Sequence, residues 1–246
     1  NAVSRSIHQL AFGIENNRYL YPYNAVAQLQ KVGDLLRATL TGNYFFNYDA
    51  KQGVNIRFFA GKIFYTQSAT NNIRYKNDRY YFTMYGANGY DDYTYSNSFI
   101  ERNQNTNLAG KQIMIRDGGF KYRSDYSSER PGRTDNWLAA LNFTFDVPNT
   151  MNSLTVLPFH VPLKVFADIG TYAEAWEDQN TNSKFLYSMG LQLPILKYFN
   201  IYWTIIQSKQ FKAPNELNGI KWWQKNITFS IDIQNVKSGI AGMKLW

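Results

Sequence analysis

The stretch Asn226-Ile-Thr-Phe-Ser-Ile-Asp-Ile-Gln234 alternates apolar and polar side chains without interruption. Successive side chains of a β-strand point to opposite sides. The pattern therefore predicts a strand with an apolar face and a polar face. The apolar face, formed by Ile227, Phe229, Ile231 and Ile233, favours apolar surroundings, and the polar face favours water. The segment Leu35–Tyr48 repeats the alternation and ends in aromatic residues, as strands do where they cross a membrane interface.

Nine further segments show a similar alternation, and no segment has a convincing helical period. They are Arg5–Glu15, Pro22–Val32, Val54–Thr66, Asp78–Ala87, Tyr93–Arg102, Asn136–Asp146, Pro162–Ala173, Lys184–Leu193 and Tyr198–Gln207. Single-chain bacterial membrane barrels have an even number of strands, so we expect a twelfth, either before Asn1 or near Leu108–Ile115. Residues 1–246 are thus predicted to form one all-β domain, an antiparallel transmembrane β-barrel of about 12 strands.

The composition fits this class of protein. The chain has 246 residues, 17% of them aromatic, a formal charge of +8 and no cysteine, which excludes a disulfide framework and a thiolate metal site. It contains no run of 18 apolar residues, which excludes a transmembrane helix, whereas a barrel strand needs only about 9–11 residues with one apolar face. The alternative is a soluble sandwich or a lipocalin-like barrel with the apolar face inside. The many aromatic residues near strand ends favour the membrane barrel.

The expected connections are short at one end of the strands and long at the other, as in membrane barrels. Asp49–Gly53 and Pro194–Lys197 are tight, whereas long polar segments join other strands, namely Gln67–Asn77, Asn103–Asp135 and Ser208–Lys225. Two connections fit less well. Gly33-Asp34 is short although it lies at the end of the strands where long loops are expected, and Val147–Val161 is rather long.

Two motifs stand among these strands: Ile115-Arg-Asp-Gly-Gly-Phe120 in the long loop, and Phe166-Ala-Asp-Ile-Gly170 downstream. Between and after them come Trp137-Leu-Ala-Ala-Leu-Asn-Phe-Thr-Phe145 and Tyr187-Ser-Met-Gly-Leu-Gln-Leu-Pro194. In this order the motifs resemble those of the BamA-like bacterial surface antigen superfamily, whose outer-membrane barrels insert or translocate proteins. The resemblance covers about the last half of the chain.

The resemblance implies that the loop folds into the barrel lumen and that Arg116 pairs there with Asp168, which Gly170 follows in its motif. A guanidinium can bind a carboxylate through two hydrogen bonds and so hold a long loop in place. Gly118 and Gly119 would allow a tight turn, with Phe120 wedged against the wall. Two positions depart from the family pattern: Asp117 intervenes between the arginine and the glycines, and Asn142 replaces a second acidic residue. Only about 115 residues precede the loop, so the barrel is expected to be smaller than in sixteen-stranded relatives.

Catalytic signals are weak, and we expect neither an enzyme within this chain nor a cofactor. His8 and His160 are far apart and lack metal-ligand spacing, so no metal site is expected. The acidic groups Asp91-Asp92 and Glu174–Asp178 are interpreted as solvated loop charge. The scattered basic residues favour no nucleic acid as a partner. They suit the anionic headgroups of outer-membrane lipid and lipopolysaccharide, in the loops Arg74–Arg79, Lys121–Arg133 and Lys221–Lys225.

Two functions remain open for a protein of the bacterial outer membrane. The barrel could act in outer-membrane protein assembly or export, with client polypeptide or other envelope proteins as partners. It could instead be the membrane anchor of a larger envelope enzyme, for example a zinc peptidase, or an accessory subunit of an outer-membrane complex. In both cases we expect the chain to be the C-terminal part of a longer protein, with 235–246 as a docking segment. A porin is a third alternative, but a plugged lumen would conduct poorly.

Overall fold

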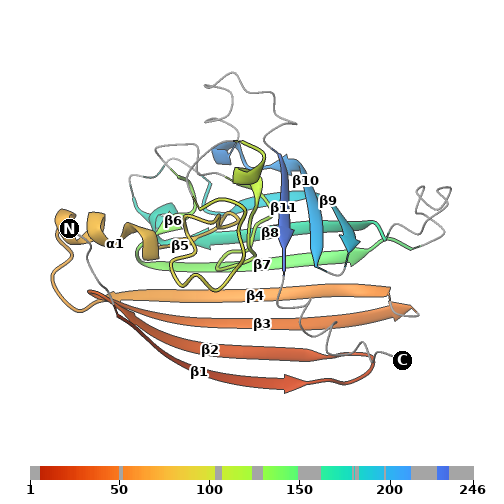
Figure 1. The fold of residues 1–246 in the computed structure, drawn as a ribbon, viewed down its shortest axis with the longest axis horizontal. Helices are drawn as coiled ribbons and strands as arrows, with labels where there is room; N and C mark the ends of the chain where they lie inside the picture. The colour runs from red at the N-terminus through yellow and green to blue at the C-terminus, as the bar shows by residue number, and fades with distance from the viewer. Residues whose placement is uncertain are drawn as a thin grey trace.

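The computed structural model describes residues 6–49, 52–102, 107–123, 130–148, 162–178, 180, 183–196, 198–211 and 226–232. In these residues the chain is all-β, and its main element is one antiparallel sheet in the order β1-β2-β3-β4-β7-β8-β9-β10-β11 (Figure 1). The strands are β1 Ile7–Asn16, β2 Tyr23–Val32, β3 Leu35–Asp49, β4 Gln52–Tyr65, β7 Trp137–Asp146, β8 Lys164–Tyr172, β9 Leu186–Leu196, β10 Phe199–Gln207 and β11 Ile227–Ile231.

Each strand of this sheet pairs antiparallel with the next one along the order. Leu40 of β3, for example, lies opposite Ala27 of β2 and Ala60 of β4. Nine of the eleven predicted strands are thereby confirmed. The sheet has two edges in the described part of the chain, β1 and β11, so closure into a barrel stays a proposal.

Two predicted strands are wrong, and so is the location near Leu108–Ile115 suggested for a twelfth, whereas a strand before Asn1 stays a prediction. In place of a strand over Asp78–Ala87 the chain forms the short helix η1 Asp78–Tyr80 and the two-residue strand β5 Phe82–Thr83, which pairs with β6 Arg133–Thr134. Tyr93–Arg102 forms turns and bends, and the region 108–115 contains the one-turn helix η2 Ala109–Lys111 and isolated bridges. Residues 82–89 are all buried, so their sequence alternation does not mark an exposed and a buried face.

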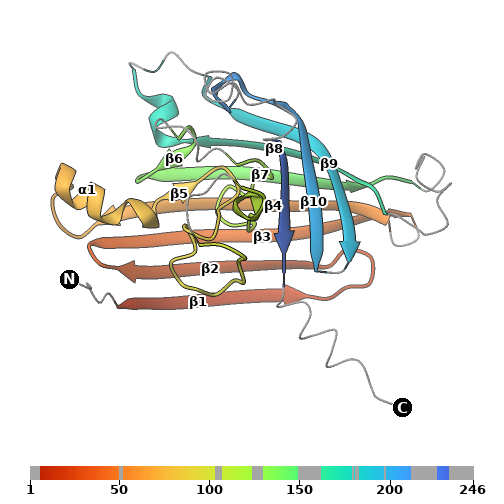
Figure 2. The same ribbon diagram turned by 45° about the horizontal axis from the view of Figure 1, so that its top comes forward.

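These elements belong to an insert between β4 and β7, defined as residues 66–136, which also contains helix α1 Asn71–Asn77. The sheet is curved, and the insert lies on its concave side (Figure 2). There Phe82, Met84, Phe120 and Tyr122 of the insert share one buried cluster with sheet residues such as Phe59. The described part of the long loop therefore packs against this concave face, called the inward face below, and the expected barrel lumen around it stays a prediction.

The outward face of the sheet exposes apolar side chains, whereas the inward face combines a buried apolar cluster with buried polar and charged groups. The inward face buries Arg37, Asn142, Asp168, Ser188 and Thr228, each at most 5% exposed. The outward face exposes large apolar side chains on β1–β4 and β7–β10, among them Phe12, Leu29, Leu40, Tyr44, Phe46, Phe58, Leu141, Ile169, Met189 and Trp203. In β11 the predicted alternation is confirmed, with Thr228 and Ser230 buried and Ile227, Phe229 and Ile231 half-exposed. No helix in the described residues is long and apolar enough to span a membrane.

Candidate functional site

The candidate site is the charged contact between the insert and the inward face of the sheet. Strand register places Asp168 of β8 between Asn142 of β7 and Ser188 of β9, all three facing the insert. Lys121 of the insert completes the group, with its Nζ 2.5 Å from Asp168 Oδ1. Asn142 Nδ2 donates to the same oxygen at 3.0 Å, and Ser188 Oγ donates to Oδ2 at 3.1 Å. The carboxylate is fully buried, so its charge is balanced entirely inside the protein.

A second charged centre surrounds Asp117. Arg37 of β3 places Nη2 3.2 Å from Asp117 Oδ1, with side-chain exposures of 6% and 4%. Arg57 of β4 donates from Nη1 to the Asp117 carbonyl oxygen at 2.8 Å and to Asn142 Oδ1 at 2.9 Å. Arg37 also donates to Gln30 Oε1, at 3.1 Å, and to the hydroxyl of Tyr93. Asn142 thus connects the Asp117 centre with the Asp168 centre.

The predicted pairing of Arg116 with Asp168 differs from the arrangement found. Arg116 places Nε 3.5 Å from Asp117 Oδ2 and donates from Nη1 to the Asp91 carbonyl oxygen at 2.9 Å. Its place beside Asp168 is taken by Lys121, which lies five residues further along the chain. Asp117, which departs from the family pattern, forms the ion pair with Arg37 that the sequence did not indicate. Lys121 directly follows the motif, but Arg37 lies 80 residues before Asp117, and nothing in the sequence links the two.

The glycines of the motifs lie where a side chain would collide with neighbours. Gly119 has φ +67°, and a Cβ there would come within 2.6 Å of Arg57 Nη1. A Cβ on Gly118 would come within 2.6 Å of the Met84 backbone, and one on Gly170 within 2.3 Å of Met84 Sδ. Phe120 is fully buried beside Phe211, with ring centroids 6.0 Å apart. These residues let the loop approach the sheet closely enough for Lys121 to reach Asp168.

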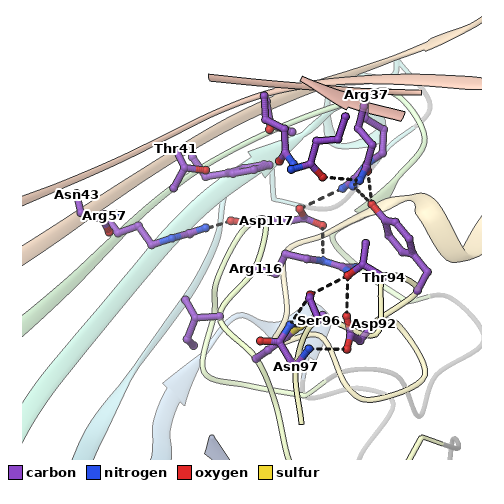
Figure 3. A pocket seen from close by; sticks show the side chains of 18 residues that line it. Arg37, Thr41, Asn43, Arg57, Asp92, Thr94, Ser96, Asn97, Arg116 and Asp117 are labelled. Atoms are coloured by element: carbon purple, nitrogen blue, oxygen red, sulfur yellow. Dashed lines mark hydrogen bonds and ion pairs between the residues drawn. The ribbon is translucent and has the colours of Figure 1, made fainter. Parts of the chain in front are cut away.

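Beside the Asp117 centre lies a polar cavity of about 640 Å³ between the sheet and the insert (Figure 3). Arg37, Thr41, Asn43 and Arg57 approach it from the sheet. From the insert, its lining includes Asp92, Thr94, Ser96, Asn97, Arg116 and Asp117. Hydroxyl, amide and ionic groups of this kind suit water and polar solutes rather than an apolar ligand.

Of the acidic groups interpreted as solvated loop charge, Asp91-Asp92 is buried, which corrects that interpretation, whereas Glu177 and Asp178 are exposed as expected and Glu174 is partly buried. Asp92 is fully buried, and its Oδ2 lies 3.1 Å from Arg102 Nη1. Glu174, in the short helix η4 Ala173–Trp176, accepts a hydrogen bond from Thr134 Oγ1 at 2.8 Å. Partial burial raises the pKa of Glu174, and nearby Asp135 and Glu177 raise it further.

Part of the predicted basic membrane surface is also interior. Lys121 and Arg123 are 4% and 1% exposed, so neither is available to lipid headgroups. Arg74 remains largely exposed and pairs with Asp135 at 3.3 Å. The segments Lys221–Lys225 and 235–246, together with His160, lie outside the described residues.

Comparison with protein-family models, curated proteins and solved structures found no match. The resemblance to the BamA-like superfamily therefore stays a prediction. Among the described residues, no group of three or more His, Cys, Asp or Glu side chains is placed to hold a metal ion. His8 lies on the exposed strand β1. Within the described residues, the site is suited to holding the insert in place.

Proposed function

We propose that this chain is a β-barrel domain of the bacterial outer membrane, with the insert as a plug in its lumen. The large apolar side chains exposed on the outward face carry the proposal, together with the charged groups buried on the inward face. In a soluble sandwich the apolar faces of the strands would be packed inside and the polar faces would meet water. Here Phe58, Leu141 and Ile169 are exposed along one row of outward positions, and Leu40 is exposed in an adjacent row. On the other face Asp168 is fully buried. A lipid bilayer outside and a polar lumen inside satisfy both faces.

The plug argues against a porin. The insert fills the concave side of the sheet with a packed cluster and with two ion-paired centres, around Asp117 and Asp168. A conducting channel needs a continuous water-filled path, and ion pairs this deeply buried are costly to open. We therefore assign the barrel a role other than solute passage.

Assembly or export of outer-membrane proteins is the first candidate for that role. In the described part of the chain, β1 and β11 each have a neighbour in the sheet on one side only. An unpaired strand edge can bind an incoming strand through main-chain hydrogen bonds. The seam between β1 and β11 would then receive the client polypeptide.

Anchoring of a larger envelope enzyme or complex is the second candidate, and the rigid plug favours it. A lumen held closed by buried charges leaves the barrel a static element in the membrane. The two candidates differ in activity. An assembly barrel in liposomes should accelerate the insertion of an unfolded outer-membrane protein, whereas an anchor should leave that rate unchanged.

The membrane proposal itself is tested with single cysteines, since the natural chain contains none. Leu40 faces outward at 44% exposure, and its neighbour Thr41 lines the interior cavity. Leu40→Cys and Thr41→Cys, each labelled with a polarity-sensitive fluorophore in liposomes, form a matched pair. We expect brominated acyl chains to quench the label at position 40 and aqueous iodide to quench the label at position 41. The reverse result would identify a soluble protein and overturn the proposal.

A further inference from the structure

A shallow groove of about 430 Å³ crosses the outward face of strands β1–β4. The small residues Ala27, Ala38 and Ala60 lie between large neighbours and leave the depression. Its large apolar lining residues are Leu10, Phe12, Leu29 and Leu40. Lys62 lines the groove on β4. The groove thus combines an apolar bed with one cation.

Charge is otherwise nearly absent from this surface. Strand alternation and register assign the outward positions, and Lys31 and Lys62 are the only residues with a positive formal charge there in the described strands. Both lie toward the end of the sheet where α1 follows β4, Lys31 one residue before the end of β2 and Lys62 three before the end of β4. Such clustering at one end places both ammonium groups at one side of the apolar band.

Neither lysine forms an ion pair within the described residues. Lys31 Nζ donates to Thr66 Oγ1 at 3.0 Å, and Lys62 Nζ donates to Asn136 Oδ1. An ammonium has three donors, so each lysine can bind an additional acceptor. A lysine on the lipid face is unfavourable at the bilayer midplane and becomes tolerable close to the headgroups. Both lysines are therefore best accommodated at the level of lipid phosphates.

The spacing of the two lysines suits one large headgroup. Strand β3 separates β2 from β4, so the lysines lie on strands about 10 Å apart. We propose that the groove, with Lys31 and Lys62, binds a lipid that carries acyl chains and two phosphates, the lipid A part of lipopolysaccharide. An acyl chain would occupy the alanine-lined bed, and the phosphates would lie against the lysines. This inference rests on the proposed membrane location of the barrel.

The test measures lipid binding by native mass spectrometry of the purified chain released from detergent micelles. Three probes are compared: bisphosphorylated lipid A, the same glycolipid after removal of its phosphates, and phosphatidylethanolamine. We expect bisphosphorylated lipid A to bind most tightly. An anionic lipid gains about 1 kcal/mol from each basic residue near the surface, so Lys31→Gln or Lys62→Gln should each weaken its binding about fivefold. The double variant should weaken binding of bisphosphorylated lipid A by the product of the two single effects.

Two further variants separate the charge from the groove. Ala38→Leu adds bulk in the bed without touching the lumen, and it should weaken binding of all acylated probes. Lys164→Gln is the control, because Lys164 is paired with Asp146 at 2.9 Å on the inward face, and its loss should leave lipid binding unchanged. Equal affinity for the three probes, or a double lysine variant that binds like the natural protein, would overturn the inference.

Failure of the membrane proposal is detected separately. The same preparations are reconstituted into liposomes and probed by the Leu40→Cys and Thr41→Cys pair. A chain that inserts but binds the three lipids equally would overturn only the lipid site. A chain that does not insert would overturn both.

Discussion

The most direct test of the interior site removes the charge of Asp168. Asp168→Asn keeps the shape of the side chain but leaves the Lys121 ammonium, 6% exposed, without its counter-ion. Breaking one partner of a buried ion pair costs about 3–5 kcal/mol. At 1.36 kcal/mol per factor of ten, the equilibrium constant for release of the loop should rise roughly a hundredfold to several thousandfold.

Hydrogen exchange of the loop amides measures this release. The amides of Gly118 and Phe120 donate to backbone oxygens of Thr83 and Met84, so they become exchangeable only when the loop opens. We expect peptides that cover residues 113–123 to exchange faster in Asp168→Asn, while peptides from strands β2 and β3 keep their protection. Asp78→Asn is the matched control, because Asp78 is 38% exposed in its ion pair with Arg133 and its loss should cost at most about 1 kcal/mol.

A second substitution distinguishes lost charge balance from lost packing. Combining Lys121→Met with Asp168→Asn removes both charges, and it should restore much of the protection lost in the single variant. Unchanged exchange in Asp168→Asn would refute the claim that this ion pair holds the loop. A double variant with the summed defects of its parents would show that hydrogen bonds to Asn142 and Ser188, rather than charge balance, dominate.

Three shorter predictions concern other parts of the fold. Gly119→Ala should destabilise the folded loop by about 1–3 kcal/mol, because φ is +67° and the new Cβ would meet Arg57. The loss should appear as faster proteolysis within the insert, and proteolysis at the natural rate would contradict it. Phe120→Ala should lower the free energy of unfolding by about 3–5 kcal/mol in a denaturant titration, since the ring is fully buried beside Phe211, and a change below 1 kcal/mol would contradict the packing described. Because burial raises the pKa of Glu174, the folded state binds more protons there, and stability should fall as pH rises from the ordinary carboxyl range through the raised pKa. Glu174→Gln should reduce this loss in melting curves recorded at several pH values, and an identical pH profile in the variant would exclude the effect.

Most of the nine strands could be predicted from the sequence because they have a face against the interior and a face that is left exposed; β1 is the exception, exposed at every residue but its last. In β11 this gives Thr228 at 0% exposure beside half-exposed Phe229, and the sequence alternates accordingly. The insert has no such pair of faces. Residues 82–89 are buried throughout, so alternation there has no single structural meaning, and the strand predicted for Asp78–Ala87 was wrong.

Asp168 could be identified from its motif, but its partner could not. The path of the loop past the sheet depends on two residues with positive φ, Asp117 at 49° and Gly119 at 67°. These turns direct Arg116 toward Asp91 and bring Lys121 to Asp168. The spacing of residues in an irregular loop does not determine where their side chains point, whereas the spacing in a strand does.

The buried ion pairs fix the position of the insert more than they stabilise the fold. A buried ion pair often contributes less than an apolar contact of the same volume, because both charges must lose their water. Apolar contacts alone, such as those of Phe120 with its cluster, are non-directional and would let the insert pack in several ways. Arg37 with Asp117 and Lys121 with Asp168 accept only one arrangement, since any shift leaves charges unpaired in the interior. The inward face thus combines an apolar cluster, which buries the insert, with paired charges, by which the long insert keeps one position.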